Sequence, residues 1–106
     1  MRAGVLRDRV LLQSHRKFRD PDGGVTDTWE DEEYVWAKVW ALRGREYVQS
    51  REQHADITIR VIIRYRPDVT PSWRIKFGER ILHVVHVIDL QGRRRELELM
   101  CREVVT

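Results

Sequence analysis

The chain has 106 residues, 35% of them charged, and its 20 basic and 17 acidic side chains leave a formal net charge of +3 at pH 7. This length suits one domain, so residues 1–106 are expected to form a single domain. The nearly balanced charge does not by itself indicate a nucleic-acid-binding protein, and no apolar run approaches the roughly 20 residues of a membrane-spanning helix, so no membrane partner is expected.

A first β-strand is predicted near the start of the chain. Val10 and Leu12 alternate with Leu11 and Gln13, and this period of two sends alternate side chains to opposite faces of a sheet. Three clustered basic side chains mark the end of this strand: Arg16, Lys17 and Arg19. The turn-forming residues 20–24 follow and predict a tight reversal of the chain.

Two further strands are predicted over 25–29 and 34–42, on either side of the acidic run 30–33. The basic and acidic clusters could bring identical subunits together, although a solvated surface of mixed charge is the simpler interpretation. In the second of these strands, Trp36 and Trp40 share one face with Lys38, and the opposite face is aliphatic. The Trp face is either a partner interface, since Trp is frequent at interface hot spots, or a second core face that closes a barrel.

Residues 43–56 interrupt the strand pattern. They contain good helix formers and no Pro, but only a narrow apolar stripe. One short helix, or a loop that becomes ordered when a partner binds, fits this insertion.

The second half of the chain returns to strands. Ile59, Val61 and Ile63 alternate with Arg60, Ile62 and Arg64, which places the odd-numbered side chains of 57–65 in the core. A turn at Gly78-Glu79 predicts a hairpin between 73–77 and 81–88. After a second turn at Gln91-Gly92, the last strand carries its core residues at odd positions, Leu97, Leu99 and Cys101. The prediction is a mainly β protein, a small antiparallel barrel or sandwich of about six or seven strands with the insertion 43–56.

No enzymatic activity and no cofactor are expected. His83 and His86 lie three residues apart, on opposite faces of a regular strand, so they could share a metal ion only if the strand contained a bulge. No nucleophile, phosphate-loop or dinucleotide motif occurs in the sequence. Cys101, the single cysteine, fits a buried thiol in a reducing compartment.

Short sequence blocks follow one another along nearly the whole chain: the basic start 1–10, Trp36-Ala37-Lys38-Val39, Gly44-Arg45-Glu46-Tyr47, Ile63-Arg64-Tyr65-Arg66-Pro67 and Arg95-Glu96-Leu97-Glu98-Leu99. Together, and in this order, they resemble the phage head-tail joining proteins, the small adaptors and stoppers between capsid and tail. Trp40, where a polar residue is expected, and His83 and His86 are the departures from the family pattern. The family's small β-barrel agrees with the fold predicted from the strand periodicity.

The resemblance implies a structural protein of the virion, located at the head-tail junction and assembled in the cytoplasm of the bacterial host. Its members bind as a ring below the portal or the portal adaptor, help to retain packaged double-stranded DNA, and offer a docking surface to the tail terminator or another tail protein. The expected partners are therefore other copies of this chain, the portal or its adaptor, the tail, and DNA contacted without sequence specificity.

We expect the partner and subunit interface to include Trp36 and Trp40, together with these residues of the insertion: Arg43, Arg45, Glu46, Tyr47 and Arg51. Arg16, Lys17 and Arg19 are candidates to line the DNA channel, where basic side chains would contact phosphates. Arg43, Arg45 and Arg51 are further candidates for this role. The alternative is a small β-barrel that binds single-stranded nucleic acid through exposed aromatic and Arg side chains.

Overall fold

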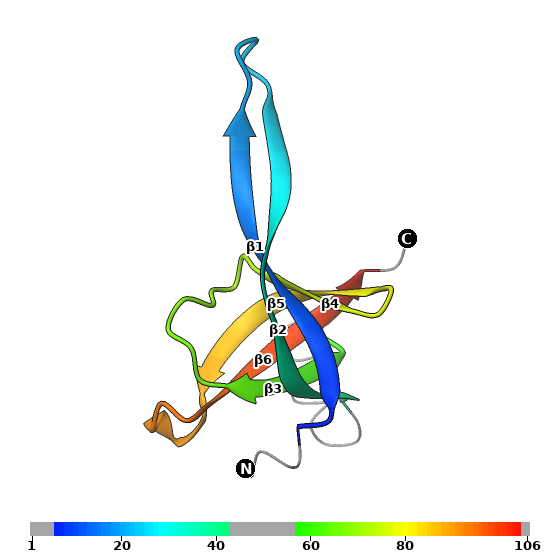
Figure 1. The fold of residues 1–106 in the computed structure, drawn as a ribbon, viewed down its shortest axis with the longest axis vertical. Helices are drawn as coiled ribbons and strands as arrows, with labels where there is room; N and C mark the ends of the chain where they lie inside the picture. The colour runs from blue at the N-terminus through cyan, green and yellow to red at the C-terminus, as the bar shows by residue number, and fades with distance from the viewer. Residues whose placement is uncertain (1–5, 43–56, 105–106) are drawn as a thin grey trace.

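A computed structural model gives the fold of residues 6–42 and 57–104. The strands are β1 (Asp8–Arg19), β2 (Val25–Ala41), β3 (Ile59–Arg64), β4 (Arg74–Phe77), β5 (Arg80–Asp89) and β6 (Glu96–Val104), and the 3₁₀ turn η2 (Leu90–Gly92) precedes β6. Neighbouring strands are antiparallel and close into a ring in the order β1-β2-β3-β6-β5-β4 (Figure 1). The predicted small antiparallel barrel is confirmed.

The barrel interior is filled by alternate side chains of the strands. Ile63 of β3 and Leu99 of β6 are fully buried, as is Cys101, and all three belong to one apolar cluster. The predicted inward faces of β3 and β6 are therefore correct. Burial raises the pKa of the Cys101 thiol to about 12, so this side chain is a neutral core residue at physiological pH.

A bulge in β5 changes which side chains face outward. The pairing of β5 with β6 shifts between Val84 and His86, so Val85 is the additional residue of the bulge. His83 is paired with Arg102 and His86 with Met100, on the outward face of the barrel in both cases. The prediction that the two histidines lie on opposite faces is wrong, because it assumed a regular strand. Within 6–42 and 57–104, no group of three or more His, Cys, Asp or Glu side chains is placed to hold a metal ion.

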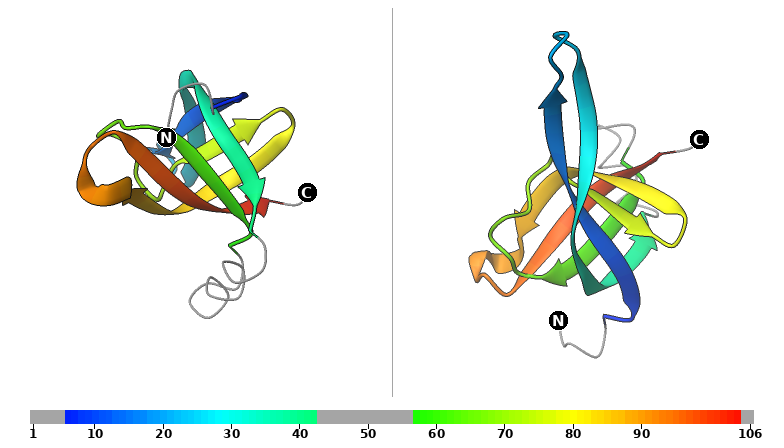
Figure 2. Two further views of the ribbon diagram at one scale, coloured as in Figure 1. Left: turned by 90° about the horizontal axis from the view of Figure 1, so that it is seen from below. Right: turned by 45° about the horizontal axis from the view of Figure 1, so that its top comes forward.

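Strands β1 and β2 continue well beyond the barrel as a two-stranded hairpin (Figures 1 and 2). Pairing between β1 and β4 ends at Gln13, and pairing between β1 and β2 shifts at the same place, which leaves Glu32 in a bulge. We call residues 14–32 the projecting hairpin. It contributes to the long axis of a molecule that measures 48 × 29 × 27 Å. The strands predicted separately over 25–29 and 34–42 are one continuous strand, which explains why the described chain has six strands rather than seven.

The described residues contain no helix long and apolar enough to cross a bilayer.

Candidate interaction surfaces

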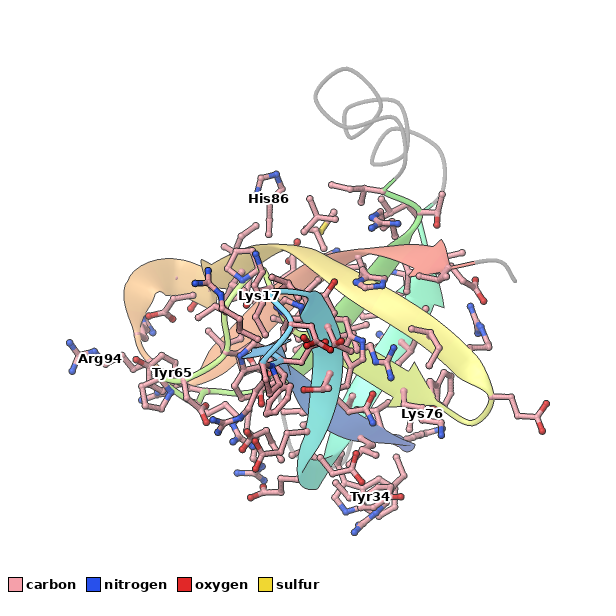
Figure 3. All side chains as sticks on the ribbon, turned by 90° about the horizontal axis from the view of Figure 1, so that it is seen from above. Lys17, Tyr34, Tyr65, Lys76, His86 and Arg94 are labelled. Carbon is pink, nitrogen blue, oxygen red and sulfur yellow. The ribbon has the colours of Figure 1, made fainter. Side chains whose placement is uncertain are left out.

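The outward face of β2 carries the most exposed aromatic side chains of the barrel. Tyr34 is 59% exposed and Trp36 is 52% exposed, whereas Val35, Ala37 and Val39 pack against the core on the inward face. The interpretation of this face as a second core face is therefore wrong for Trp36. Figure 3 shows the Tyr34 side chain directed away from the barrel.

Arg9 of β1 lies beside both exposed aromatic rings. Its guanidinium carbon is 5.7 Å from the centroid of the Tyr34 ring and 5.2 Å from that of Trp36, and Arg9 is the cross-strand partner of Trp36. Cation–π contacts at such distances contribute about 0.5–1 kcal/mol at exposed sites. Arg9 thus holds the two rings in place while leaving much of their apolar surface exposed.

A groove of about 530 Å³ separates these aromatic residues from the chain that follows β3. Residues 33–36 and 64–68 line it, and we call it the aromatic groove. Tyr65 and Pro67 add apolar surface from the far side, while Arg64 and Arg66 add positive charge. Glu33 and Asp68 also line it, so the groove combines aromatic, apolar, cationic and anionic groups in one concave surface.

An ion pair fixes the far wall of the aromatic groove. Arg66 donates two hydrogen bonds of 2.8 Å to the two carboxylate oxygens of Asp68, and its guanidinium lies 5.6 Å from the centroid of the buried Trp73 ring. Hydrogen bonding to Arg66 lowers the pKa of Asp68, so the carboxylate stays charged in mildly acidic solution. The backbone N–H of Tyr65 donates to the carbonyl of Arg95 at 2.9 Å, which ties the same segment to the residue immediately before β6. This wall is set before any partner binds.

Trp40 lies on the same face of β2 but is half-buried between two cations. Lys38 Nζ is 4.8 Å and the Arg60 guanidinium carbon 4.9 Å from the centroid of the Trp40 ring, and Arg60 donates a 2.5 Å hydrogen bond to Glu98. The ring thus already has polar neighbours within the chain. Of the two Trp residues predicted at an interface, Trp36 offers more apolar surface to a partner.

Trp29 anchors the projecting hairpin to the barrel. Its ring centroid is 4.9 Å from that of His15 on the paired strand and 5.4 Å from that of His83 on β5. The Arg74 guanidinium carbon lies 4.3 Å from the Trp29 ring centroid, and Arg74 Nε donates to Gln13 at 2.6 Å. Burial and the nearby positive charges of Arg102 and Arg74 hold the pKa of His83 below its ordinary value, which keeps its imidazole neutral at pH 7.

Three of the basic residues predicted to line a DNA channel, Arg16, Lys17 and Arg19, lie on the projecting hairpin. They do not converge on one face: Arg16 is paired with Thr28, whereas Lys17 and Arg19 are paired with Asp27 and Val25 on the opposite side of the ribbon. Arg16 also forms an ion pair with Glu30. The projecting hairpin contains six acidic and three basic side chains, hence a formal net charge of −3, so it is not a basic surface.

The remaining predicted site residues, Arg43, Arg45, Glu46, Tyr47 and Arg51, lie outside the described residues, as does the whole insertion 43–56.

The sequence patterns did not single out the aromatic groove or the tip of the projecting hairpin. At the tip, Phe18 is 60% exposed and Val25 57% exposed. Tyr34 could have been found, since it lies two residues before Trp36 and therefore on the same face of the strand. No periodicity connects 33–36 with 64–68, because these segments meet only when the barrel closes.

Comparison with known proteins places this architecture among phage proteins. The family model "Phage head completion protein" matches residues 1–104. The chain is 27% identical over 107 residues to the head completion protein gp7 of Enterobacteria phage HK97, with 96% of each chain covered. The solution structure of protein SF1141 from Shigella flexneri 2a matches with a TM-score of 0.78 and 35% identity, over 97% of this chain and 96% of that one.

A chain of the native gene transfer agent virion has the same fold, with a TM-score of 0.66 and 22% identity over 95% of this chain and 97% of that one. The whole-length match to the family model, with a relative that shares both sequence and fold, confirms the family indicated by the sequence blocks. This chain belongs to the phage head completion protein family, a family of structural proteins of the virion.

Proposed function

We propose that this protein binds as a ring below the portal or its adaptor, helps to retain packaged DNA, and provides the surface on which the tail docks. The observation that carries this proposal is the pair of exposed binding elements on a rigid barrel, the projecting hairpin and the aromatic groove. Neither is covered within the described chain, and each exposes large hydrophobic side chains, Phe18 and Val25 on the hairpin and Tyr34 and Trp36 in the groove. The name of its HK97 relative, a head completion protein, supports the same function.

In this proposal the protein works through contacts rather than chemistry. The barrel supplies a fixed frame, and its exposed aromatic side chains supply the interface energy, since interface hot spots are rich in Trp and Tyr. DNA is contacted through phosphates by Arg16, Lys17 and Arg19, with Arg43, Arg45 and Arg51 as further candidates. Because each subunit adds only a few phosphate contacts, retention depends on the assembled ring.

Complementation in vitro tests the proposal. Purified protein is added to a lysate of the parent phage lacking this gene, infectious particles are counted, and the heads are viewed by electron microscopy. The expected result is that infectivity returns and unjoined, filled heads acquire tails. The proposal is wrong if heads and tails remain apart after addition, or if tailed particles form without the protein.

A single observation favours a second candidate, the binding of single-stranded nucleic acid: exposed Tyr34 and Trp36 rings beside a guanidinium group form a platform on which bases can stack. This function requires the isolated chain to bind an oligonucleotide tightly, with affinity that falls steeply as salt is raised. Fluorescence anisotropy with labelled single-stranded and double-stranded DNA separates the two functions. Weak binding of both by the isolated subunit supports the connector function.

A further inference from the structure

The large exposed hydrophobic side chains of the described residues are concentrated in two places. Phe18 and Val25 lie at the tip of the projecting hairpin, and Tyr34 and Trp36 lie in the aromatic groove, whereas Ile88 is the only other member of the set within 6–42 and 57–104. Burying apolar side chains of this size is a main source of stability in protein complexes. The two places are therefore the strongest candidates for contact surfaces on the chain.

The tip and the groove have complementary shapes. The tip is narrow: Phe18 is paired with Thr26 and Arg19 with Val25, and hydrogen bonds between the backbone of Asp20 and those of Gly23 and Gly24 close the turn. Two backbone N–H groups, of Asp22 and Gly24, also donate to the Asp20 carboxylate at 3.1 Å. The tip is thus a narrow, preformed turn that presents Phe18 on one face of the ribbon and Val25 on the other, and the groove is a concave surface that includes aromatic rings.

Their charges are complementary as well. The projecting hairpin has a formal net charge of −3, whereas the other described residues contain thirteen basic and eight acidic side chains, hence +5. Asp22 lies at the tip of the hairpin, and Arg64 lines the groove. Arg66 also lines the groove, but it is paired with Asp68 and lies 3.7 Å from Glu33, so the attraction at this contact rests on Arg64. Opposite charges at the two surfaces favour the contact and set its orientation.

The tip cannot fill the groove of its own chain. Tyr34 is nine residue positions along the continuous extended strand from Val25, a distance of about 30 Å at roughly 3.3 Å per residue. The hairpin also points away from the barrel throughout its length (Figure 1). Only a second molecule can bring a tip into the groove.

We infer that the tip of the projecting hairpin of one copy inserts into the aromatic groove of a neighbouring copy. Phe18 contacts the rings of Tyr34 and Trp36, and Asp22 approaches Arg64. A contact between two different surfaces of identical chains repeats from copy to copy, and it forms a ring when the rotation closes. This inference rests on the ring proposed above and identifies the contact that holds the ring together.

Cysteine crosslinking in assembled particles tests the contact. A chain carrying both Asp22→Cys and Arg64→Cys is added to the gene-deficient lysate, and the tailed particles are purified, oxidised and run on a non-reducing gel. The expected result is a ladder of covalent multimers, since each copy bonds to the next. Native Cys101 does not compete, because it is buried and its pKa of about 12 leaves almost no thiolate.

Matched controls test whether crosslinking is specific to the contact between the tip of one copy and the groove of the next. The pair Asp22→Cys with Glu79→Cys places the second thiol in the exposed β4–β5 turn, outside the groove, and should give no ladder. The two single variants, Asp22→Cys and Arg64→Cys, should crosslink to each other when mixed. Crosslinking of either single variant with itself would instead indicate tip-to-tip or groove-to-groove pairing and overturn the inference.

Charge exchange provides a second readout that does not depend on oxidation. Asp22→Arg or Arg64→Asp alone should lower complementation about tenfold or more, because each places like charges at the contact. The chain with both substitutions, or a mixture of the two single variants, should recover most of the activity. Recovery by neither would show that the tip or the groove meets a different protein.

The failure of this inference can be told from the failure of the proposed function. If the unsubstituted protein restores infectivity but no crosslinked ladder forms, the contact is wrong and the connector function stands. If the unsubstituted protein does not restore infectivity, the proposed function itself is wrong.

Discussion

The barrel and the projecting hairpin are built from the same two strands, yet their environments differ completely. Within the barrel, β1 has two neighbouring strands, and Val10 and Leu12 are buried in the core. Beyond Gln13 the strand has one neighbour, and from Arg16 to Arg19 every residue is exposed. One continuous strand thus passes from a fully packed environment into solvent at a bulge.

This difference shows how a polar ribbon can remain ordered without a core. A two-stranded hairpin on its own is marginally stable in water. The projecting hairpin has instead a tight turn at its tip, the Trp29 anchor at its root, and polar pairs along its length, such as His15 with Asp27 at 2.9 Å. Charges along its open edges also oppose unwanted strand pairing. Four substitutions or conditions separate the two regions experimentally, and their effects differ in size.

The largest loss of stability should follow truncation in the barrel core. Leu99→Ala removes a fully buried side chain from the centre of β6, and the cavity that remains should lower the free energy of unfolding by about 2–5 kcal/mol. Urea denaturation followed by circular dichroism measures this change. Ile88→Ala, at a position that is 44% exposed, is the matched control and should cost less than about 1 kcal/mol. Equal costs at the two positions would show that the barrel is not the stabilising unit.

An intermediate effect is expected at the root of the hairpin. Trp29→Ala removes the ring that contacts His15, His83 and Arg74, which should cost about 1–2 kcal/mol through lost cation–π and aromatic contacts. Backbone amide exchange should accelerate over 14–32 more than in β3 and β6. Trp36→Ala is the control, since its ring is largely exposed and lies on the barrel. Uniform acceleration throughout the chain would contradict an anchor confined to the hairpin.

Sequence periodicity predicted the barrel far better than the hairpin. The inward faces of 59–63 and 97–101 follow from apolar residues at every odd-numbered position, opposite even-numbered positions that include Arg60, Glu98 and Arg102. The acidic run 30–33 gave the impression of a break between strands. In fact a solvated two-stranded ribbon imposes no apolar alternation, so charged residues continue β2 without interruption.

The sequence predicted residues of the candidate site only where the alternation of side chains along a strand shows which of them share a face. The alternation along β2 put Trp36 on the face opposite Val35, Ala37 and Val39 but left open whether that face was exposed, and the groove residues 64–68 come from a distant part of the chain. The bulge at Val85 left no signal in a run that is apolar on both faces, and it reversed the predicted orientation of His86 relative to His83. Closure of the barrel and local bulges are properties of packing, so they are not encoded in any short window.

A smaller, pH-dependent effect is expected from His83. Burial and nearby positive charges lower its pKa in the folded protein, so the unfolded chain binds the proton more tightly than the folded one. The stability that neutral His83 contributes is therefore fully present above about pH 6.5, the pKa of histidine in the unfolded chain. It is lost as the pH falls through the lower pKa that His83 has in the folded protein. Urea titrations at several pH values from neutral to mildly acidic measure this loss. His83→Gln should flatten the dependence in this range, and an unchanged dependence in that variant would show that another group is responsible.

The smallest change in stability is expected at the tip of the hairpin, where the functional effect should be large. Phe18→Ser replaces a ring that is 60% exposed, so the free energy of unfolding of the isolated chain should change by no more than about 0.5 kcal/mol. If the tip fills a neighbour's groove, the same substitution removes a buried aromatic contact in each copy, and complementation should fall about tenfold or more. Phe18→Tyr keeps the ring and should retain most of the activity. A stable Phe18→Ser protein with full activity would mean that the exposed tip has no binding role. A stable Phe18→Ser protein without activity would show that Phe18, although exposed in the isolated chain, is covered by a partner in the assembled particle.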